Sequence, residues 1–209
     1  MLFRSQLKKE PIEVFETWVL LGKDSGMEKN HSEAVENMIS FATDKCGKFS
    51  FIDAGCGNGW VVRNVSKMSN CITAVGIDGA ENMILKAKDE DPLNHYFCDN
   101  LMNWTPNEKV DIVHSMEVLY YLQNPQKLIE HIYKNWLKEN ARLIIGIDFY
   151  SENTVSHSWP EDCGISIMQL FPESTWKKFF IEIGFRNIES WRVGAKKDWT
   201  GTLVVTGIK

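Results

Sequence analysis

The chain has 209 residues, which is enough to bury one sizeable hydrophobic core. Its 28 acidic residues outnumber its 23 Lys and Arg, and the resulting net charge of −5 argues against a general nucleic-acid binder, which neutralises phosphates with a basic face. The hydrophobic fraction of 44% and the charged fraction of 24% exclude disordered and collagen-like chains. No apolar run reaches the roughly 20 residues of a membrane span, and no signal-peptide block opens the chain, so we expect a cytoplasmic protein without membrane contact.

The cysteine pattern favours neither a disulfide framework nor a zinc site, because the number of cysteines is odd and none forms a Cys-x-x-Cys pair. We therefore expect reduced thiols in a reducing compartment, and we predict no metal site. The five cysteines are Cys46, Cys56, Cys71, Cys98 and Cys163.

The first predicted elements are two helices. Apolar residues at helical spacing predict the first over residues 11–22, and a polar stretch separates it from a second that continues to Ala42. No repeat, low-complexity tract or linker divides the chain, so we expect a single domain over residues 1–209. Within it, residues 1–46 are expected to form an N-terminal helical cap and residues 47–209 the core.

Strands and helices then alternate along the chain. Such alternation predicts βαβ units and a mostly parallel sheet that is covered by helices on both faces. Asn124 is expected to cap the third of these helices, and Pro125 suits its first turn. Strands are predicted at 51–54, 71–77, 95–98, 110–115 and 142–148, and helices at 60–68, 80–88 and from Pro125 to Leu137.

The C-terminal part reads differently. Residues 149–171 are expected to be irregular, and a helix over 175–183 is closed by Gly184. Two strands follow, at 186–193 and 202–208, with only a few polar residues between them. That short connection predicts a hairpin at the end of the sheet.

The most informative stretch is the turn from Asp53 to Trp60, which joins the first strand to the next helix. Its three glycines let the backbone approach a ligand closely, and in an open α/β sheet ligands bind where the strands end. A dinucleotide-binding turn needs its third glycine at position 60, so Trp60 disfavours a nicotinamide cofactor. A P-loop is excluded because no Gly-Lys-Ser/Thr follows.

Two acidic residues end the next two strands. Asp78 follows the last glycine of the turn by about 20 residues, where a carboxylate can accept hydrogen bonds from both hydroxyls of a ribose. Asp99 ends the third strand, where it can accept from an exocyclic amine such as adenine N6. Together they predict a nucleoside ligand that is bound without a diphosphate cradle.

Taken in order, these segments resemble the class I S-adenosylmethionine-dependent methyltransferases. The resemblance runs from about Phe51 to Lys209 and implies S-adenosyl-L-methionine as the cofactor. It also implies a Rossmann-like, doubly wound α/β sheet of seven strands in the order 3-2-1-4-5-7-6, with strand 7 antiparallel, preceded by N-terminal helices. The segments that carry it are the turn 53–59, Asp78, Asp99, residues 110–119 and residues 184–189.

The resemblance implies positions for the cofactor. Its methionyl part would lie against the turn, where backbone N–H groups can face a carboxylate, and the expected residues are Asp53, Gly55, Cys56, Gly57, Asn58 and Gly59. The ribose and the adenine would meet residues after the second and third strands, namely Asp78, Gly79, Met83, Asp99 and Asn100. Ser115 and Met116 are expected near the sulfonium, whereas Met83 fits a helix core equally well.

The acceptor side is predicted from the loops after strands four and five. Many small-molecule methyltransferases carry Glu-His after strand four; here Tyr120 and Tyr121 stand there, which puts a metal-assisted or histidine-base mechanism in doubt. The long irregular stretch 149–171 is typical of a lid or binding loop. We expect the acceptor pocket to be lined by Glu117, Tyr121, Tyr150, Glu152, His157 and Trp159.

Two catalytic residues are predicted within that set. His157 is the expected base, because histidine titrates near neutrality without help, and Tyr121 is the second candidate. The alternative is a solvent-exposed loop with a single packed tryptophan. In this family the segment before strand one often covers the cofactor, and the candidates for such a lid are Trp18, Met27, Glu28 and His31.

The function implied is methyl transfer to a small-molecule acceptor. A basic stripe, a nucleic-acid module and an Asn-Pro-Pro-Tyr motif after strand four are all absent from the sequence, so no nucleic-acid partner is expected. The alternative is a non-catalytic protein of the same fold that binds S-adenosylmethionine or S-adenosylhomocysteine, because methyl transfer can proceed without an indispensable acid or base. A nicotinamide oxidoreductase is a weaker third interpretation. The oligomeric state and the acceptor atom stay open.

Overall fold

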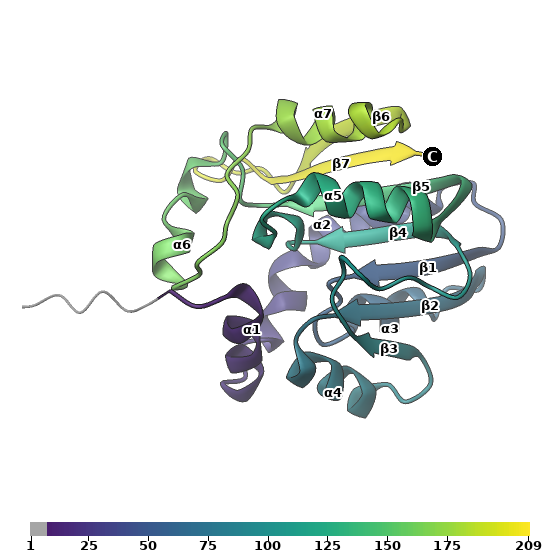
Figure 1. Ribbon diagram of the computed structural model, residues 1–209, viewed down its shortest axis with the longest axis horizontal. Coiled ribbons are helices and arrows are strands. Elements are labelled where there is room, and N and C mark those ends of the chain that lie inside the picture. The colour runs from purple at the N-terminus through teal and green to yellow at the C-terminus, as the bar shows by residue number, and fades with distance from the viewer. Residues whose placement is uncertain (1–7) are drawn as a thin grey trace, which may run out of the picture.

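The computed structural model describes residues 8–209, which form one seven-stranded sheet in the order β3-β2-β1-β4-β5-β7-β6 (Figure 1). β7 runs antiparallel to both β5 and β6, and the other neighbours are parallel. The predicted fold class and strand order are thereby confirmed. The strands are β1 Phe49–Ala54, β2 Cys71–Asp78, β3 His95–Cys98, β4 Val110–Met116, β5 Leu137–Ile147, β6 Arg186–Val193 and β7 Thr202–Ile208.

β1 lies in the middle of the sheet, and its residues are all buried. It pairs in parallel with β2 on one side and β4 on the other, so the three strands end at the same edge. At that edge Asp53 stands opposite Gly76 of β2 and opposite His114 of β4. The strand order reverses here, and this is where open α/β sheets bind their ligands.

Helices cover both faces of the sheet. On one face α5, α7 and the π-helical turn η2 bury Trp136 and Phe180, and on the other α2, α3 and α4 pack around Met38. β1 alternates between the two cores, giving Ile52 to the first and Phe51 to the second. The helices are α1 Pro11–Leu20, α2 Ser25–Thr43, α3 Trp60–Val65, α4 Glu81–Glu90, α5 Pro125–His131, α6 Trp159–Asp162 and α7 Glu173–Ile183, with the short turns η1 Leu119–Tyr121, η2 Ile132–Trp136 and η3 Thr154–Ser156.

The two N-terminal helices have different roles. α2 lies within the range 1–46 where a cap is expected, but it buries Val35 and Met38 in the core and is part of the sheet packing. α1 lies beside α4 near the carboxyl ends of the strands (Figure 1). The Glu16 carboxylate accepts hydrogen bonds from the backbone N–H groups of Glu81 and Asn82, at 2.9 Å for the second. α1 therefore caps the N-terminus of α4, where backbone N–H groups have no partner within the helix.

The clearest boundary difference lies between α5 and β5. Asn124 caps α5 through its side chain, as predicted. The helix then widens into η2, where the Trp136 indole N–H donates to the backbone oxygen of Trp104 at 3.0 Å. β5 begins directly after this turn, at Leu137 rather than near Arg142. The predicted helix is too long because the apolar residues after 131 serve the same core from a turn and a strand.

The C-terminal predictions are largely confirmed. Gly184 ends α7 with a φ of 103°, and β6 and β7 pair over the predicted ranges. The stretch 149–171 is irregular apart from the short η3 and α6. Among the helices that the structure describes, none has the length and apolar character that crossing a membrane requires.

Candidate active site

A cavity of about 970 Å³ opens at the carboxyl ends of the strands. Ligand pockets run from roughly 300 to 1,000 Å³, so this one is large. Its walls come from the glycine turn, from α1 and α2, and from the segments after β2, β3, β4 and β5. Because these segments are far apart in sequence, only the fold brings them together.

The glycine turn forms the floor of the cavity. Gly55 and Gly57 have φ values of 80° and 52°, in the left-handed region that favours glycine. A Cβ at Gly55 would lie 2.2 Å from Cγ2 of Val118, and one at Gly57 would lie 2.7 Å from Cε of Met27. The turn is therefore packed against the loop after β4 on one side and against α2 on the other.

Asp78 ties the turn to the next strand and helix. Its Oδ2 accepts from the backbone N–H of Gly57 at 2.9 Å, and its Oδ1 accepts from the N–H of Ala80 at 2.8 Å. Burial raises the pKa of this carboxyl, and these two hydrogen bonds oppose the rise. Asp78 lies at the end of β2 and lines the cavity, and its contact with a ribose stays a prediction.

The residues predicted around the adenine also line the cavity. Asp99 and Asn100 are exposed at the end of β3, and Met83 is buried on α4. A Cβ at Gly79 would lie 2.8 Å from Cδ1 of Ile12, so α1 covers this part of the cavity closely. We call residues 53–57, 78–83 and 99–100 the cofactor end of the cavity.

Asp53 has a partner that the sequence analysis missed. Its Oδ1 lies 2.7 Å from Nδ1 of His114, and both side chains are buried. The pair stands directly opposite across β1 and β4, so the register of the sheet could have suggested it. Asp53 lines the cavity from this fixed position.

Three predicted cofactor residues, Asn58, Gly59 and Ser115, do not line the cavity. The Asn58 side chain donates to Oδ2 of the buried Asp24 at 2.9 Å, so it fastens the turn to the start of α2. Gly59 packs against the Tyr96 ring behind the turn. Ser115 is buried and donates to the backbone oxygen of Ala54 at 2.7 Å, while its neighbour Met116 does line the cavity.

Asp24 anchors α2 to two elements of the cofactor end. Besides Asn58, it accepts a hydrogen bond from the Lys86 ammonium on α4 at 2.6 Å. Burial raises the pKa of Asp24, but its hydrogen bonds with Lys86 and Asn58 outweigh burial and lower it.

Cys56 lies in the turn with its thiol buried. Burial, with smaller contributions from Asp78 and Asp53, holds the pKa of this thiol well above its usual range, so it remains an unreactive thiol. The described residues contain no group of three or more His, Cys, Asp or Glu side chains that could hold a metal ion.

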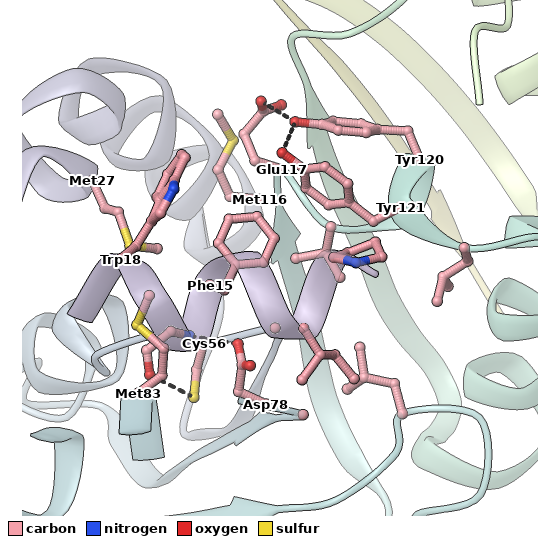
Figure 2. Close-up of a pocket in the computed structure, with 18 of the residues that line it drawn as sticks. Phe15, Trp18, Met27, Cys56, Asp78, Met83, Met116, Glu117, Tyr120 and Tyr121 are labelled. Atoms are coloured by element: carbon pink, nitrogen blue, oxygen red, sulfur yellow. Dashed lines mark hydrogen bonds between the residues drawn. The ribbon is translucent and has the colours of Figure 1, made fainter. Parts of the chain in front are cut away.

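The opposite end of the cavity is built around Glu117, which follows β4 directly (Figure 2). Its carboxylate accepts hydrogen bonds from the Tyr120 hydroxyl and from the backbone N–H of Asp148. Burial and the nearby charge of Asp148 raise the pKa of Glu117 well above its usual range. Its φ of 59° is unusual for a residue with a side chain, a strain that is common at functional sites.

Figure 2 shows aromatic side chains beside this carboxylate. The Tyr120 and Tyr121 hydroxyls are 3.3 Å apart, and the Tyr121 ring packs edge-on against Phe15 of α1. Trp159 lines the same cavity and stacks on Trp199 with ring centroids 6.3 Å apart. Glu117, Tyr121 and Trp159, which were predicted to line one pocket, all line this cavity. Phe15 and Trp199 line it too and were not predicted.

The remaining acceptor-pocket predictions require correction, because these side chains point elsewhere. Tyr150 is buried and donates to the backbone oxygen of Gly201 at 2.9 Å. Glu152 is exposed and accepts from the N–H of Glu173 at the start of α7, at 3.2 Å. His157, the predicted base, is exposed with Nε2 3.2 Å from the backbone oxygen of Ser151, outside the cavity.

The lid candidates divide in a similar way. Trp18, Met27 and His31 line the cavity, whereas Glu28 does not. His31 reaches Asp148, a residue that follows β5 and was not predicted as part of the site. Asp148 stands at a strand end like Asp78, and that signal could have found it. We call His31, Glu117, Tyr121, Asp148 and Trp159 the acceptor end of the cavity.

Comparison with known proteins identifies the family. A model of the methyltransferase domain family matches residues 11–190. The chain belongs to this family. A putative methyltransferase, 235L of Invertebrate iridescent virus 6, is 28% identical over 159 residues, which cover 76% of the chain and 55% of the relative.

A second curated relative of this methyltransferase-domain chain is the ubiquinone biosynthesis O-methyltransferase of Glaesserella parasuis serovar 5. It is 35% identical over 104 residues, which cover 45% of the chain and 43% of the relative. The chain thus spans about half the length of the curated relatives that it matches.

Solved structures share the fold at low sequence identity. A chain from the complex of the Haloferax volcanii Trm112 methyltransferase activator with a putative methyltransferase superposes with a TM-score of 0.78 at 22% identity, covering 93% of this chain and 96% of that one. The N-methyltransferase NodS from Bradyrhizobium japonicum WM9, solved with S-adenosyl-l-homocysteine, gives a TM-score of 0.67 at 14% identity, covering 85% and 86%.

Proposed function

We propose that this chain is an S-adenosylmethionine-dependent methyltransferase that acts in the cytoplasm on a small-molecule acceptor. One observation carries the proposal: a single cavity holds the glycine turn with Asp78 at one end and an aromatic, acid-lined chamber at the other. A methyltransferase needs this arrangement, because donor and acceptor must lie end to end for an in-line displacement.

The cofactor end fits the donor. Side chains are absent from Gly55 and Gly57, where a Cβ would clash, so the backbone of the turn can approach the methionyl group. Asp78 would hold the ribose hydroxyls, and Asp99 would meet the edge of the adenine. Bound there, the cofactor supplies a methyl group already activated on a sulfonium.

Several observations support a small acceptor. Residues of α1 and α2 line the chamber, and its aromatic walls are formed by Phe15, Trp18, Tyr121, Trp159 and Trp199. Two curated relatives are named as O-methyltransferases of ubiquinone biosynthesis, and NodS is named as an N-methyltransferase. The cytoplasmic part of the proposal rests on the sequence, whose odd number of cysteines without a Cys-x-x-Cys pair suits a reducing compartment.

Trp60 argues against the nicotinamide alternative. It is buried where a dinucleotide-binding turn would need a glycine for close packing of helix and strand. A nucleic-acid acceptor would require an open, basic surface, whereas this cavity is lined mainly by apolar and acidic residues.

Calorimetry with S-adenosylmethionine, S-adenosylhomocysteine and NAD tests the cofactor. We expect both sulfur nucleosides to bind and NAD not to bind. A second assay incubates the protein and labelled methyl donor with a metabolite pool and follows label in the small-molecule fraction. Binding without transfer would favour the non-catalytic alternative, and failure to bind either sulfur nucleoside would contradict the proposal.

A further inference from the structure

Two titratable side chains meet at the acceptor end, apart from the residues assigned to the cofactor. His31 comes from α2 and Asp148 follows β5, and Nδ1 of His31 lies 3.5 Å from Oδ2 of Asp148. Both residues line the cavity. The Asp148 side chain is 5% exposed and the His31 side chain 24%, so the pair is embedded while part of the imidazole remains accessible.

The pair leaves buried polar atoms without a partner. Within residues 8–209, neither His31 Nδ1 nor Asp148 Oδ1 has a hydrogen-bond partner, and both atoms are buried. Such atoms are rare in folded proteins because each one loses its hydration without replacement. Beside a large cavity, this pattern indicates a site that a ligand completes. Catalytic hydrogen bonds are often long in the free enzyme and shorten in the complex, so a separation of 3.5 Å is compatible with a working pair.

Burial sets the protonation states of the pair near neutral pH. Burial lowers the pKa of His31 to about 4, and burial raises the pKa of Asp148 to about 6. Near neutral pH the imidazole is therefore uncharged and the aspartate is a carboxylate. In the tautomer that carries its proton on Nδ1, on the side of Asp148, Nε2 of His31 is left as the proton acceptor, as in other His–Asp pairs. The other titratable groups around Asp148 are Glu117, Tyr121 and Tyr150.

The walls around the pair restrict the acceptor. Among residues 8–209, six carboxylate residues line the cavity against two lysines, Lys23 and Lys127, which disfavours an anionic acceptor. Aromatic rings in the walls of the same cavity favour an apolar or aromatic body. The carboxylate residues are Glu10, Asp53, Asp78, Asp99, Glu117 and Asp148.

The presence of a base separates two kinds of nucleophile. A neutral amine can attack with its lone pair and keep the positive charge as an ammonium product, so transfer itself needs no base. A hydroxyl must lose its proton when the new bond to carbon forms, and a His–Asp pair supplies the group that takes it.

We propose that His31, held by Asp148, is the proton acceptor of the reaction, and that the nucleophile is a hydroxyl on an apolar or aromatic acceptor. This inference rests on the proposed function. The acceptor oxygen attacks the methyl carbon, the carbon–sulfur bond breaks, and its electron pair stays on sulfur. The hydroxyl proton passes to Nε2 of His31. Positive charge thus moves from the sulfonium to the imidazolium, and Asp148 stabilises it there without a change in the net charge of the site.

The test uses the full chain, tritiated methyl donor and two phenols, namely catechol and 4-nitrophenol. Aniline serves as the amine probe. The variants are His31→Gln and Asp148→Asn, and the matched control is His157→Gln, an exposed histidine outside the cavity. Donor binding by calorimetry and thermal unfolding are measured for every protein.

We expect His31→Gln to bind the donor like the wild type but to methylate catechol about 100- to 10,000-fold more slowly. At pH 9, where 4-nitrophenol is already ionised, this deficit should shrink, because an ionised oxygen needs no base. The wild-type rate with catechol should fall below about pH 6, where Asp148 takes up a proton, and Asp148→Asn should abolish that fall. The control should match the wild type throughout.

Each other outcome is decisive. Unchanged rates in His31→Gln, or an equal deficit with both phenols, would overturn the role of His31 as proton acceptor. A wild type that binds the donor but methylates neither phenol, or methylates only aniline, would overturn the hydroxyl assignment. Failure of the wild type to bind the donor would instead overturn the proposed function.

Discussion

The two ends of the cavity are built by different means. The cofactor end is set mainly by backbone: a turn of glycines with positive φ, and short segments that directly follow β1, β2 and β3. The acceptor end is set by side chains that arrive from α2, from the loops after β4 and β5, and from α6. A backbone-built end suits a ligand that stays the same, whereas an end built from side chains can be altered by substitution without changing the fold.

The ends meet at the loop after β4. Val118 packs into the space that a side chain at Gly55 would need, and its neighbour Glu117 belongs to the acceptor end. A change at the turn should therefore reach both ligands.

The largest effect is expected from Gly55→Ala. The added methyl group would lie 2.2 Å from Cγ2 of Val118, on a residue with a φ of 80°. Strain and overpacking should lower the free energy of unfolding by about 3 kcal/mol and abolish donor binding. Urea unfolding and calorimetry measure the two effects.

The double variant Gly55→Ala/Val118→Ala is the matched control. It restores space but not the backbone conformation, so it should recover part of the stability. Normal donor binding by Gly55→Ala alone would show that the two ends are independent.

The next largest effect concerns stability at the acceptor end, where Asp148 and His31 should give opposite dependences on pH. The pKa of Asp148 is raised to about 6, so the native state holds a proton that the unfolded state has released, and this contribution to stability falls as pH rises from about 4 to 6. The pKa of His31 is lowered from 6.5 to about 4, so its contribution falls as pH drops through the same window.

When one partner is removed, only the pH dependence of stability that comes from the other partner should remain. Relative to the wild type, His31→Gln should gain stability between pH 7 and pH 4, and Asp148→Asn should lose it, each by up to about 3 kcal/mol. Urea unfolding at several pH values measures this. Curves for both variants that stay parallel to the wild type would contradict the burial assigned to the pair.

A smaller effect is expected from Asp78→Asn at the cofactor end. The variant loses the charge that accepts from Gly57 and Ala80 and that would hold the ribose. Hydrogen bonds to charged groups contribute about 1.5 to 3 kcal/mol, so donor affinity should fall about 10- to 100-fold in calorimetry. Asp99→Asn, at an exposed residue, should lose less. The reverse ranking would contradict the assignment of Asp78.

The smallest effect is expected from His157→Gln. The side chain is exposed, and its contact is with the backbone of Ser151 rather than with the cavity. Donor affinity, stability and transfer should equal those of the wild type. A loss of transfer alone would restore the sequence-based assignment of His157 as the base.

The difference between the cofactor end and the acceptor end also explains what could be predicted from the sequence. The fold, the strand order and the position of Asp78 follow from local patterns, because each strand end is marked by its own turn or acid. Most of the turn follows too. Asn58 is the exception, since its side chain is taken by Asp24, a partner distant in sequence.

The acceptor end could not be predicted in this way. His31 and Asp148 meet only because α2 crosses beneath the end of β5, a packing that neither segment records by itself. His157 has the right chemistry, but η3 and α6 turn its loop so that Trp159 faces the cavity instead. Residue type identified a candidate base, whereas its direction depended on tertiary structure.

The attachment of the N-terminal helices has a consequence for the order of events in turnover. Glu16 and Asp24 fasten α1 and α2 to α4 and to the turn, and these same helices carry Phe15, Trp18 and His31. The demethylated nucleoside can therefore leave only when α1 and α2 loosen, and these two helices also line the acceptor end. We expect an obligatory sequence in which the donor enters first and the spent nucleoside departs last.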